Sequence, residues 1–409
     1  MTETRVCPRK SCSANGVPQP ASEFTYRADV QSKLSSMCRA CSRDKNRRDH
    51  ERRTSGGLKI IRAQSGDPGD TAQQLLIARL RNEVVGFRQQ VRDLERMVLT
   101  GENLRNILGT LGSPNVRSSP DWLRGASKSR STTGTAVLVI SDIHWSEVVQ
   151  SDQIGGCNSY NTEIANSSLR NTFKNAIRLL KGHMSRPKYD GMVVPLLGDL
   201  LSGNIHEELV ETNESPIRRS MMEIEEVLIE GLGGLADEFK KLHVPCVTGN
   251  HGRMHKKPRA KNRAVENYEW SIYHRLASYF RRDSRLTFDI PEGSDVSWPI
   301  YKQRYAATHG DQFRGGDGIG GIMVPIQRGV AKKQVRQQAI GEAFDVLMMG
   351  HWHQYVHMNR LIINGSVKGY DEYAYQQNYA FEPPQQALFV VHPEVGCTFR
   401  MPVLCRRPS

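Results

Sequence analysis

The sequence lacks any run of about 18 consecutive apolar residues, which excludes a helix that spans a membrane. It also lacks an apolar stretch after the charged start Met1–Arg5, so we expect no secretory signal. Its eight cysteines in 409 residues are too few for a disulfide scaffold, so we expect a reducing compartment, the cytoplasm of a bacterium or of a phage-infected host cell. The chain is 38% hydrophobic and 24% charged, which is typical of a folded protein and excludes a wholly disordered one.

Positive charge is concentrated in the N-terminal third of the chain. Residues 1–134 contain 24 Lys and Arg against 13 Asp and Glu, whereas residues 135–409 contain 32 against 30. This asymmetry favours an anionic partner for the N-terminal part, most often nucleic acid. A basic face that only keeps the protein in solution is the alternative.

Composition divides the chain into five segments. They are a cysteine-rich module at 1–45, a basic helix or linker at 46–71, a helical segment at 72–110, a flexible linker rich in Ser, Gly, Thr and Pro at 111–134, and a mixed α/β domain at 135–409. The helical segment carries β-branched residues seven apart, at Ile77, Val84, Val91 and Val98, with Leu80, Phe87 and Leu94 three positions later. This pattern favours a two-stranded coiled coil and a homodimer through residues 77–101. A helix packed on its own catalytic domain is the alternative.

Two close cysteine pairs lie near the N-terminus, Cys7 with Cys12 and Cys38 with Cys41. Zn²⁺ takes four thiolates in tetrahedral geometry, and metal binding would supply folding free energy to a segment with few large apolar residues. We therefore predict one structural Zn²⁺. The segment resembles the treble-clef or ribbon-like zinc modules at the start of many phage and bacterial nuclease-associated proteins.

Five short motifs between residues 135 and 409 carry metal-ligand side chains, most of them directly after an apolar run. They are Asp142-Ile-His144, Gly198-Asp199, Gly249-Asn250-His251, His309-Gly310 and Gly350-His351-Trp-His353. Open α/β sheets bind ligands at the carboxyl ends of their strands, and glycine lets the backbone turn sharply there. Mixed Asp, Asn and His ligands suit two divalent metal ions bridged by one carboxylate and a hydroxide.

Taken together and in this order, the motifs resemble those of the calcineurin-like metallophosphoesterases, in particular the phage and bacterial repair-nuclease-like branch. The resemblance covers about residues 135–405. It implies an α/β fold, a four-layer αββα sandwich with a dinuclear metal centre at the strand ends. It further implies one metal held by Asp142, His144 and His353, a second held by Asn250, His309 and His351, and Asp199 as the bridge between them. His251 matches the family's transition-state histidine. The family often has an acidic residue after Gly-Asn-His, whereas Gly252-Arg253 follows here, so the pattern offers no carboxylate partner for His251.

The chemistry that the resemblance implies is phosphoester hydrolysis by a metal-activated hydroxide, with His251 stabilising the transition state or protonating the leaving oxygen. We favour Mn²⁺, while Mg²⁺, Fe and Zn²⁺ also suit these ligands. A DNA nuclease, endo- or exonucleolytic, is the favoured function. The alternatives are a phosphatase or phosphodiesterase that acts on a small molecule or a phosphoprotein, with the zinc module recruiting a partner, and an inert DNA-binding protein. The complete ligand set argues against the inert protein.

Basic residues without an intervening acid follow Gly-Asn-His and could follow a polyanionic backbone. The candidate contacts to DNA are Arg253, Lys256, Lys257 and Arg259 here, together with Arg47 and Arg48 in the N-terminal basic helix. A solvated loop is the alternative interpretation.

Overall fold

The computed structural model describes residues 4–7, 17–20, 22, 24–26, 34–38, 40–41, 119–125, 132–313 and 322–406. The chain divides into two compact units, Met1–Met97 and Val98–Ser409. The expected basic helix at 46–71 and the helical segment at 72–110 lie outside the described residues, as do Cys12, Arg47 and Arg48. No helix among the described residues combines the length and the apolar content that a membrane span requires.

A six-stranded sheet forms the first half of the larger unit. Its strands, in spatial order, are β15 (Gly396–Leu404), β14 (Gln385–His392), β5 (Gly134–Leu138), β6 (Tyr189–Val193), β7 (Leu242–Pro245) and β8 (Leu286–Asp289). The strands from β5 to β8 are parallel, and β14 runs antiparallel to both β5 and β15. The parallel strands therefore end at one edge of the sheet, where α/β folds place their ligands.

A five-stranded sheet forms the second half. Its strands, in spatial order, are β12 (Val356–His357), β13 (Leu361–Ile363), β11 (Val346–Met349), β10 (Gln303–Thr308) and β9 (Asp295–Ile300). Here β13, β11 and β10 are parallel, and the two outer strands run antiparallel to their neighbours.

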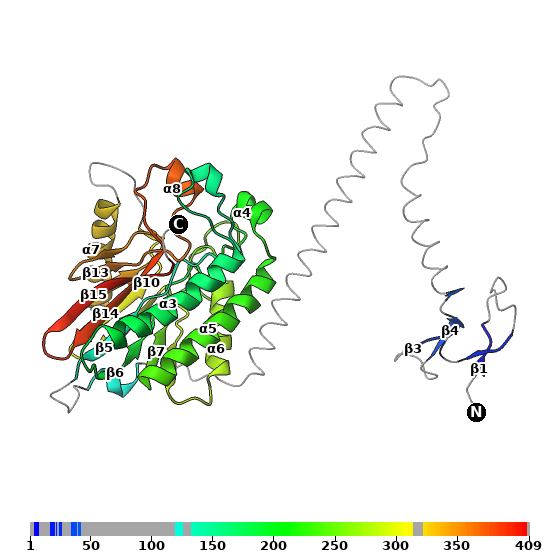
Figure 1. Ribbon diagram of the computed structural model, residues 1–409, viewed down its shortest axis with the longest axis horizontal. Helices are drawn as coiled ribbons and strands as arrows, with labels where there is room; N and C mark the ends of the chain where they lie inside the picture. The colour runs from blue at the N-terminus through cyan, green and yellow to red at the C-terminus, as the bar shows by residue number, and fades with distance from the viewer. Residues whose placement is uncertain are drawn as a thin grey trace, which may run out of the picture. The chain divides into compact units, whose positions relative to one another are not determined.

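Helices cover the outer faces of the two sheets. The helices, including two short 3-10 turns, are η2 (Asp121–Leu123), η3 (Ser151–Ile154), α3 (Thr162–Gly182), α4 (Glu207–Thr212), α5 (Ile217–Phe239), α6 (Tyr268–Tyr279), α7 (Met323–Ala339) and α8 (Glu372–Gln376). Figure 1 shows α3 and α5 lying side by side across the six-stranded sheet. Helix α7 packs on the five-stranded sheet through Ile326, which is fully buried with Leu347 of β11.

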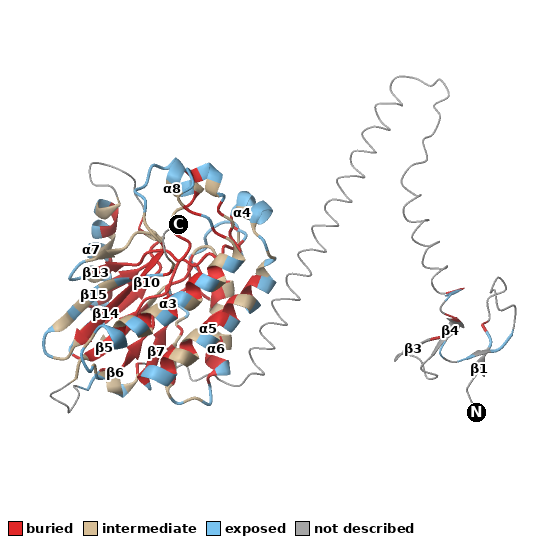
Figure 2. Ribbon diagram, in the orientation of Figure 1, coloured by how far each residue is buried: buried red, intermediate tan, exposed pale blue. Residues whose placement is uncertain are grey.

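Side-chain alternation along β5 explains why two sheets stack. Ala136 and Leu138 join the apolar cluster under α3, α5 and α6, whereas Val137 joins the cluster that contains Trp298 and Phe389 between the sheets. A strand with both faces buried is a near-continuous apolar run, as the sequence shows here. Figure 2 shows the strands buried between layers whose outer helix faces are exposed. The fold is thus mixed α/β with two sheets and covering helices, as predicted.

The structure differs from the expected flexible linker at 111–134. The turn η2 lies inside that range, and Leu123 is fully buried in the cluster between the sheets. The carbonyl of Leu123 also accepts a hydrogen bond of 2.6 Å from the backbone N–H of Tyr301. Composition suggested a linker, but two apolar side chains, Trp122 and Leu123, pack this turn against the α/β unit.

Among its described residues, the smaller unit contains two short antiparallel strand pairs. They are β1 (Thr4–Arg5) with β2 (Gln19–Pro20), and β3 (Phe24–Tyr26) with β4 (Leu34–Cys38). Cys7, Phe24, Cys38 and Cys41 form a buried cluster within this described part. The sulfur atoms of the three cysteines lie within 4.8 Å of one another, which suits thiolate coordination of one metal ion.

Candidate metal centre

All five sequence motifs lie just beyond the carboxyl ends of strands. Asp142 and His144 follow β5, Asp199 follows β6, and Asn250 and His251 follow β7 of the first sheet. From the second sheet, His309 follows β10, and His351 and His353 follow β11. The two sheets therefore deliver their polar side chains to one place, although more than 200 residues separate Asp142 from His353 along the sequence.

The backbone around these ligands is held in the left-handed conformation, which residues other than glycine rarely adopt. Five of the seven predicted ligands have positive φ angles: Asp142 at 52°, His144 at 52°, Asp199 at 49°, His351 at 70° and His353 at 53°. A left-handed backbone at a residue other than glycine costs about 1–3 kcal/mol and persists only where the surrounding structure enforces it. Such strain is typical of binding sites.

Two glycines allow the carboxylates to sit tightly against the backbone. A Cβ atom on Gly249 would lie 2.1 Å from Oδ1 of Asp199, and one on Gly350 would lie 2.3 Å from Oδ2 of Asp142. Contacts below 3.0 Å force a shift, so only glycine fits at these positions.

The first cluster consists of Asp142, His144 and His353, whose ligand atoms lie within 4.8 Å of one another. Nε2 of His144 lies 3.1 Å from Nε2 of His353, and Nε2 of His353 lies 3.4 Å from Oδ1 of Asp142. Two ring nitrogens and a carboxylate thus converge on a common point.

The second cluster consists of Asp199, His309 and His351. Nε2 of His309 lies 3.0 Å from Oδ2 of Asp199 and 3.1 Å from Oδ1 of Asn250. Nδ1 of His309 donates to the carbonyl oxygen of Leu197 at 2.7 Å, and this bond directs Nε2 of the same ring toward Asp199. Oδ2 of Asp199 also lies 3.9 Å from Nε2 of His144, so Asp199 stands between the two clusters.

The electrostatics of these buried groups favour bound cations. Asp142 and Asp199 are at most 1% exposed, and although burial raises a carboxyl pKa, His353 holds the pKa of Asp142 and His309 that of Asp199 below the ordinary value. Burial lowers the pKa of His144 to about 4 and that of His351 to about 4, assisted by Lys368 and His309 respectively. Burial lowers the pKa of His309, but the carboxylate of Asp199 outweighs it and raises this pKa to about 10, so a metal ion would replace the proton held there. Ionised carboxylates and neutral imidazoles are the forms that bind divalent metals. The donor set therefore fits a pair of divalent ions.

His251 lies beside both clusters and is oriented by the backbone. Its Nδ1 donates to the carbonyl oxygen of Ser202 at 2.7 Å, and its backbone N–H donates to Oδ1 of Asp199 at 2.8 Å. Its ring centroid is 4.5 Å from that of His144. The missing carboxylate partner is thus replaced by a main-chain carbonyl, which fixes the tautomer and leaves Nε2 available.

A buried ionic chain, which the sequence motifs did not reveal, supports His144. Nδ1 of His144 lies 3.1 Å from Oε2 of Glu147, whose Oε1 accepts a 2.7 Å hydrogen bond from Nζ of Lys368. Lys368 also pairs with Asp371 at 2.6 Å and is 3% exposed. The spacing of Glu147 three residues after His144 is the only sequence signal for this contact.

Glu269 and Asn267 support the other side of the centre. Glu269 is fully buried and accepts backbone hydrogen bonds from Leu200 and Gly249, each 2.7 Å long. Asn267 donates to the carbonyl oxygen of Gly249 at 2.8 Å. These bonds fix the turns that carry Asp199 and Asn250. Asn267 caps α6, which the sequence motifs did not indicate as part of the site.

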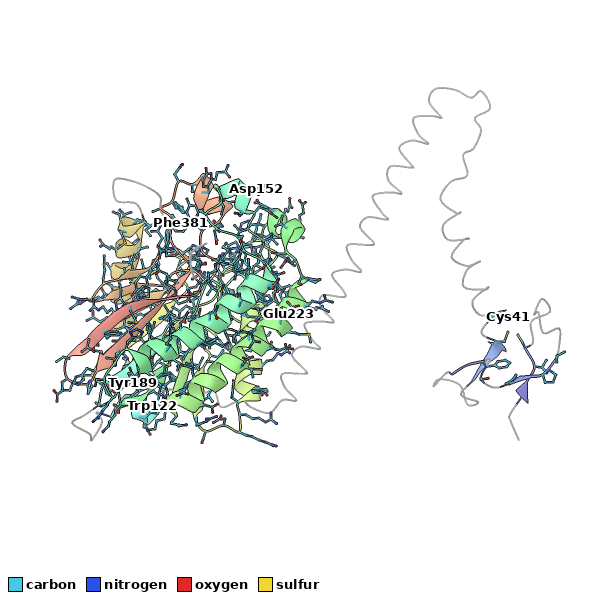
Figure 3. The ribbon with its side chains drawn as sticks, in the orientation of Figure 1. Cys41, Trp122, Asp152, Tyr189, Glu223 and Phe381 are labelled. Carbon is cyan, nitrogen blue, oxygen red and sulfur yellow. The ribbon has the colours of Figure 1, made fainter. Side chains whose placement is uncertain are left out.

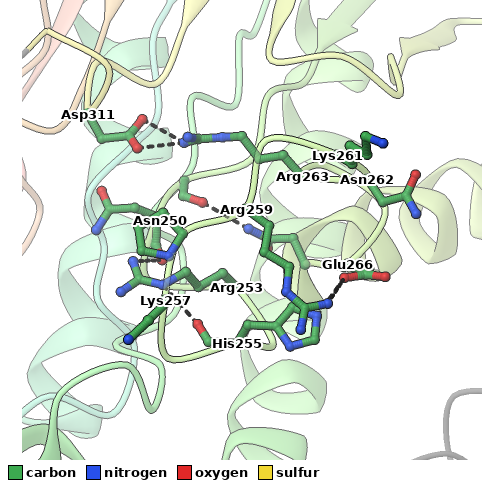
Figure 4. A pocket seen from close by; sticks show the side chains of 13 residues that line it. Asn250, Arg253, His255, Lys257, Arg259, Lys261, Asn262, Arg263, Glu266 and Asp311 are labelled. Atoms are coloured by element: carbon green, nitrogen blue, oxygen red, sulfur yellow. Dashed lines mark hydrogen bonds and ion pairs between the residues drawn. The ribbon is translucent and has the colours of Figure 1, made fainter.

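The basic residues after His251 form a loop at residues 253–263, the basic loop, which lines a small pocket with Asn250 (Figure 4). The guanidinium of Arg253, one of the candidate DNA contacts, donates to the carbonyl oxygens of Asn250, His255 and Lys256 and so holds the loop together. The exposed Lys256 pairs with Glu207, and Arg259 with Glu266. Arg263 reaches Asp311 through two hydrogen bonds of 2.6 and 2.7 Å. Lys257 and Lys261 have no ion pair within the described residues.

No family model matches the sequence, and no curated protein matches it significantly. Among solved structures, a single mutant of Vps29 from Entamoeba histolytica is 15% identical, with 65% of this chain and 98% of that chain covered and a TM-score of 0.28. A Streptococcus pneumoniae protein predicted to be a phosphoesterase is 13% identical, over 63% of this chain and 84% of that one, with a TM-score of 0.25. The sulfate thiohydrolase SoxB of Thermus thermophilus is 10% identical, with 69% of this chain and 59% of that chain covered and a TM-score of 0.29. At these values the functional conclusion depends on the site itself.

Proposed function

We propose that the protein is a metal-dependent phosphodiesterase of the calcineurin-like metallophosphoesterase superfamily and that it cleaves DNA. One observation carries the proposal: donors from both sheets gather in two clusters with Asp199 between them. Five of these donors are held on a strained backbone, which a purely structural role does not require.

In this proposal Asp142, His144 and His353 hold one divalent ion, and Asn250, His309 and His351 hold the other. Asp199 contributes to both. Two divalent ions bound there would acidify a water molecule and offset the charge that develops on phosphate oxygens. We favour Mn²⁺ because hard oxygen ligands are mixed with imidazoles.

His251 would transfer a proton to the leaving oxygen. Its Nδ1–H is committed to the carbonyl oxygen of Ser202, so Nε2 is the nitrogen that can exchange a proton with substrate. The carbonyl of Ser202 is uncharged, so it fixes the ring of His251 without placing a negative charge beside it, as a carboxylate partner would. General acid catalysis of this kind contributes about 10²- to 10⁴-fold.

The distribution of positive charge supports DNA as the substrate. Residues 1–134 carry a surplus of 11 positive charges, and the basic loop lies directly beside Asn250. The ion pair of Lys256 with Glu207 is exposed, and exposed ion pairs contribute little to stability, so a phosphate can replace the carboxylate.

The N-terminal unit would position the enzyme on DNA. Cys7, Cys38 and Cys41, with Cys12 as the fourth ligand, would hold one structural Zn²⁺. Metal analysis of a Cys38→Ser variant should then give one zinc fewer per chain than the wild type, and equal zinc contents would contradict this site. Homodimerisation through residues 77–101 remains a further proposal, which the sedimentation velocity of the full chain tests.

The nuclease function is tested with the full-length protein, Mn²⁺ and three DNA substrates: supercoiled plasmid, linear duplex and a single strand. We expect cleavage that is lost in both Asp199→Asn and His251→Ala, with nicked or shortened products that identify an endonuclease or an exonuclease. Intact DNA beside rapid hydrolysis of bis-p-nitrophenyl phosphate would contradict the nuclease function and favour a small or protein-borne phosphoester.

A further inference from the structure

An exposed and uncharged aromatic segment lies at residues 373–381. Four of its nine residues are aromatic, and the exposed fractions are 65% for Tyr373, 52% for Tyr375, 40% for Tyr379 and 52% for Phe381. None of the nine residues is charged. Exposed segments are ordinarily rich in charge, and a cluster of exposed aromatic side chains is typical of a contact surface.

The aromatic segment is preformed. The ring centroids of Tyr373 and Tyr379 are 6.2 Å apart, and the ring of Tyr370 lies 5.6 Å from Phe381 and 6.5 Å from Tyr375. The hydroxyl of Tyr370 donates to the carbonyl oxygen of Tyr379 at 2.8 Å, which closes the segment into a loop. A surface that is already ordered loses little conformational freedom when a ligand binds.

The same segment adjoins the metal centre. Tyr370 and Tyr379 line a small pocket together with Trp352, Glu382 and the predicted metal ligand His353. Asp371, which caps the N-terminus of α8, belongs to the ionic chain that reaches His144 through Lys368 and Glu147. Figure 3 shows Phe381 at the end of the unit where Asp152 also lies, away from Trp122 and Tyr189.

Positive charge borders the centre on the side of Asn250. The basic loop lines the pocket there and includes the exposed Lys257 and Lys261. On the aromatic side, Glu372 and Glu382 flank the segment, and their carboxylates are fixed in place by the backbone N–H groups of Gln150 and Tyr355. A ligand that crosses the centre therefore meets cations next to one cluster, and aromatic rings with a carboxylate at each end of their segment next to the other.

We propose that the aromatic segment stacks the bases of unpaired DNA, so that the substrate is a single strand or an unpaired end. This inference rests on the nuclease function proposed above. Groove cations that contact phosphates, combined with aromatic rings that stack on bases, are the general means of binding single strands. In a duplex the bases stack on one another and their faces are not available to tyrosine. The amide side chains of Gln376, Gln377 and Asn378 carry both donors and acceptors, so they can form hydrogen bonds with the edges of any base.

The test compares Tyr373→Ala/Tyr379→Ala with Tyr279→Ala in the full-length protein with Mn²⁺. Tyr279 is a matched control, because it is 61% exposed at the end of α6 and lines no pocket with a metal ligand. The substrates are a single-stranded oligonucleotide, the duplex of the same sequence, a strand of equal length that is abasic throughout, and bis-p-nitrophenyl phosphate.

We expect the wild type to prefer the single strand to the duplex. The double variant should lower kcat/KM for the single strand by about 5- to 100-fold, the effect of a lost base–aromatic stack. Its kcat/KM for the abasic strand and for the small diester should equal that of the wild type. The control Tyr279→Ala should have the kcat/KM of the wild type on every one of these substrates.

DNA cleavage with an unchanged kcat/KM in the double variant, an equal loss on the abasic strand, or a preference for the duplex would overturn this inference and leave the nuclease function standing. Hydrolysis of the small diester without any cleavage of DNA would overturn the nuclease function, and this inference with it.

Discussion

Glu147 illustrates how one residue outside the ligand set can decide the geometry of a ligand. Its carboxylate lies 3.1 Å from Nδ1 of His144 and also neutralises the buried Lys368. Replacing it by Gln keeps the shape but removes the charge, so His144 is less firmly oriented. We expect Glu147→Gln to weaken Mn²⁺ binding about 10- to 100-fold, measured by calorimetry. The matched control is Glu394→Gln, an exposed residue between β14 and β15, and equal affinities in the two variants would contradict the role of Glu147.

A second residue-scale prediction concerns stability in acid. Burial lowers the pKa of His243 on β7 to about 3, whereas an unfolded histidine titrates near 6.5. The unfolded chain therefore binds a proton between pH 6.5 and 3 that the folded chain does not, and stability is lost as pH falls through this window. By pH 5 the loss from this residue is about 2 kcal/mol.

The measurement is denaturant unfolding of the wild type and of His243→Leu at pH 7 and pH 5. The variant lacks the titrating ring, so its stability should fall by about 2 kcal/mol less than that of the wild type over the same interval. A parallel decline of the two proteins would show that His243 does not contribute to acid sensitivity.

At the scale of secondary-structure elements, the turns after the strands decide whether the ligands meet. Alanine at Gly350, directly after β11, would place Cβ 2.3 Å from the carboxylate of Asp142. We expect Gly350→Ala to lower phosphodiesterase activity by more than about 100-fold, since displacements near 1 Å cost that much. Gly234→Ala is the control, because no atom lies within 4 Å of the Cβ that would be added to this glycine of α5. This variant should keep its activity and be slightly more stable than the wild type, since alanine favours a helix more than glycine does. Full activity of Gly350→Ala would refute the close approach.

The same elements show what the sequence could predict. Apolar β-branched runs ending in Asp, Asn or His predicted the strands β5, β6, β7, β10 and β11, because strands with both faces buried need such runs and strand ends present polar groups. Glu147, Lys368 and Glu269 could not be predicted, since their roles come from contacts across the fold: 221 residues separate Glu147 from Lys368. The hydrogen bonds of Arg253 to nearby carbonyls could not be predicted either, because they depend on the conformation of the loop.

At the scale of the whole molecule, the larger unit begins earlier than composition suggested. Leu123 is fully buried between the sheets, and its loss leaves a cavity whose cost is about 2–5 kcal/mol. We expect a fragment that starts at residue 119 to melt at the temperature of the full chain's larger unit, and a fragment that starts at residue 135 to melt several degrees lower. Scanning calorimetry of both fragments checks this, and identical melting temperatures would mean that η2 does not stabilise the unit.

The central claim is that two metal ions sharing Asp199 make this protein a phosphodiesterase. The most direct measurement is Mn²⁺-dependent hydrolysis of bis-p-nitrophenyl phosphate by the wild type, by Asp199→Asn and by Asp152→Asn, an exposed control on η3. We expect activity that requires Mn²⁺, is abolished by chelation, is lost in Asp199→Asn and is unchanged in Asp152→Asn. Hydrolysis that persists in Asp199→Asn, or a wild type that is inactive with every divalent ion, would contradict the account.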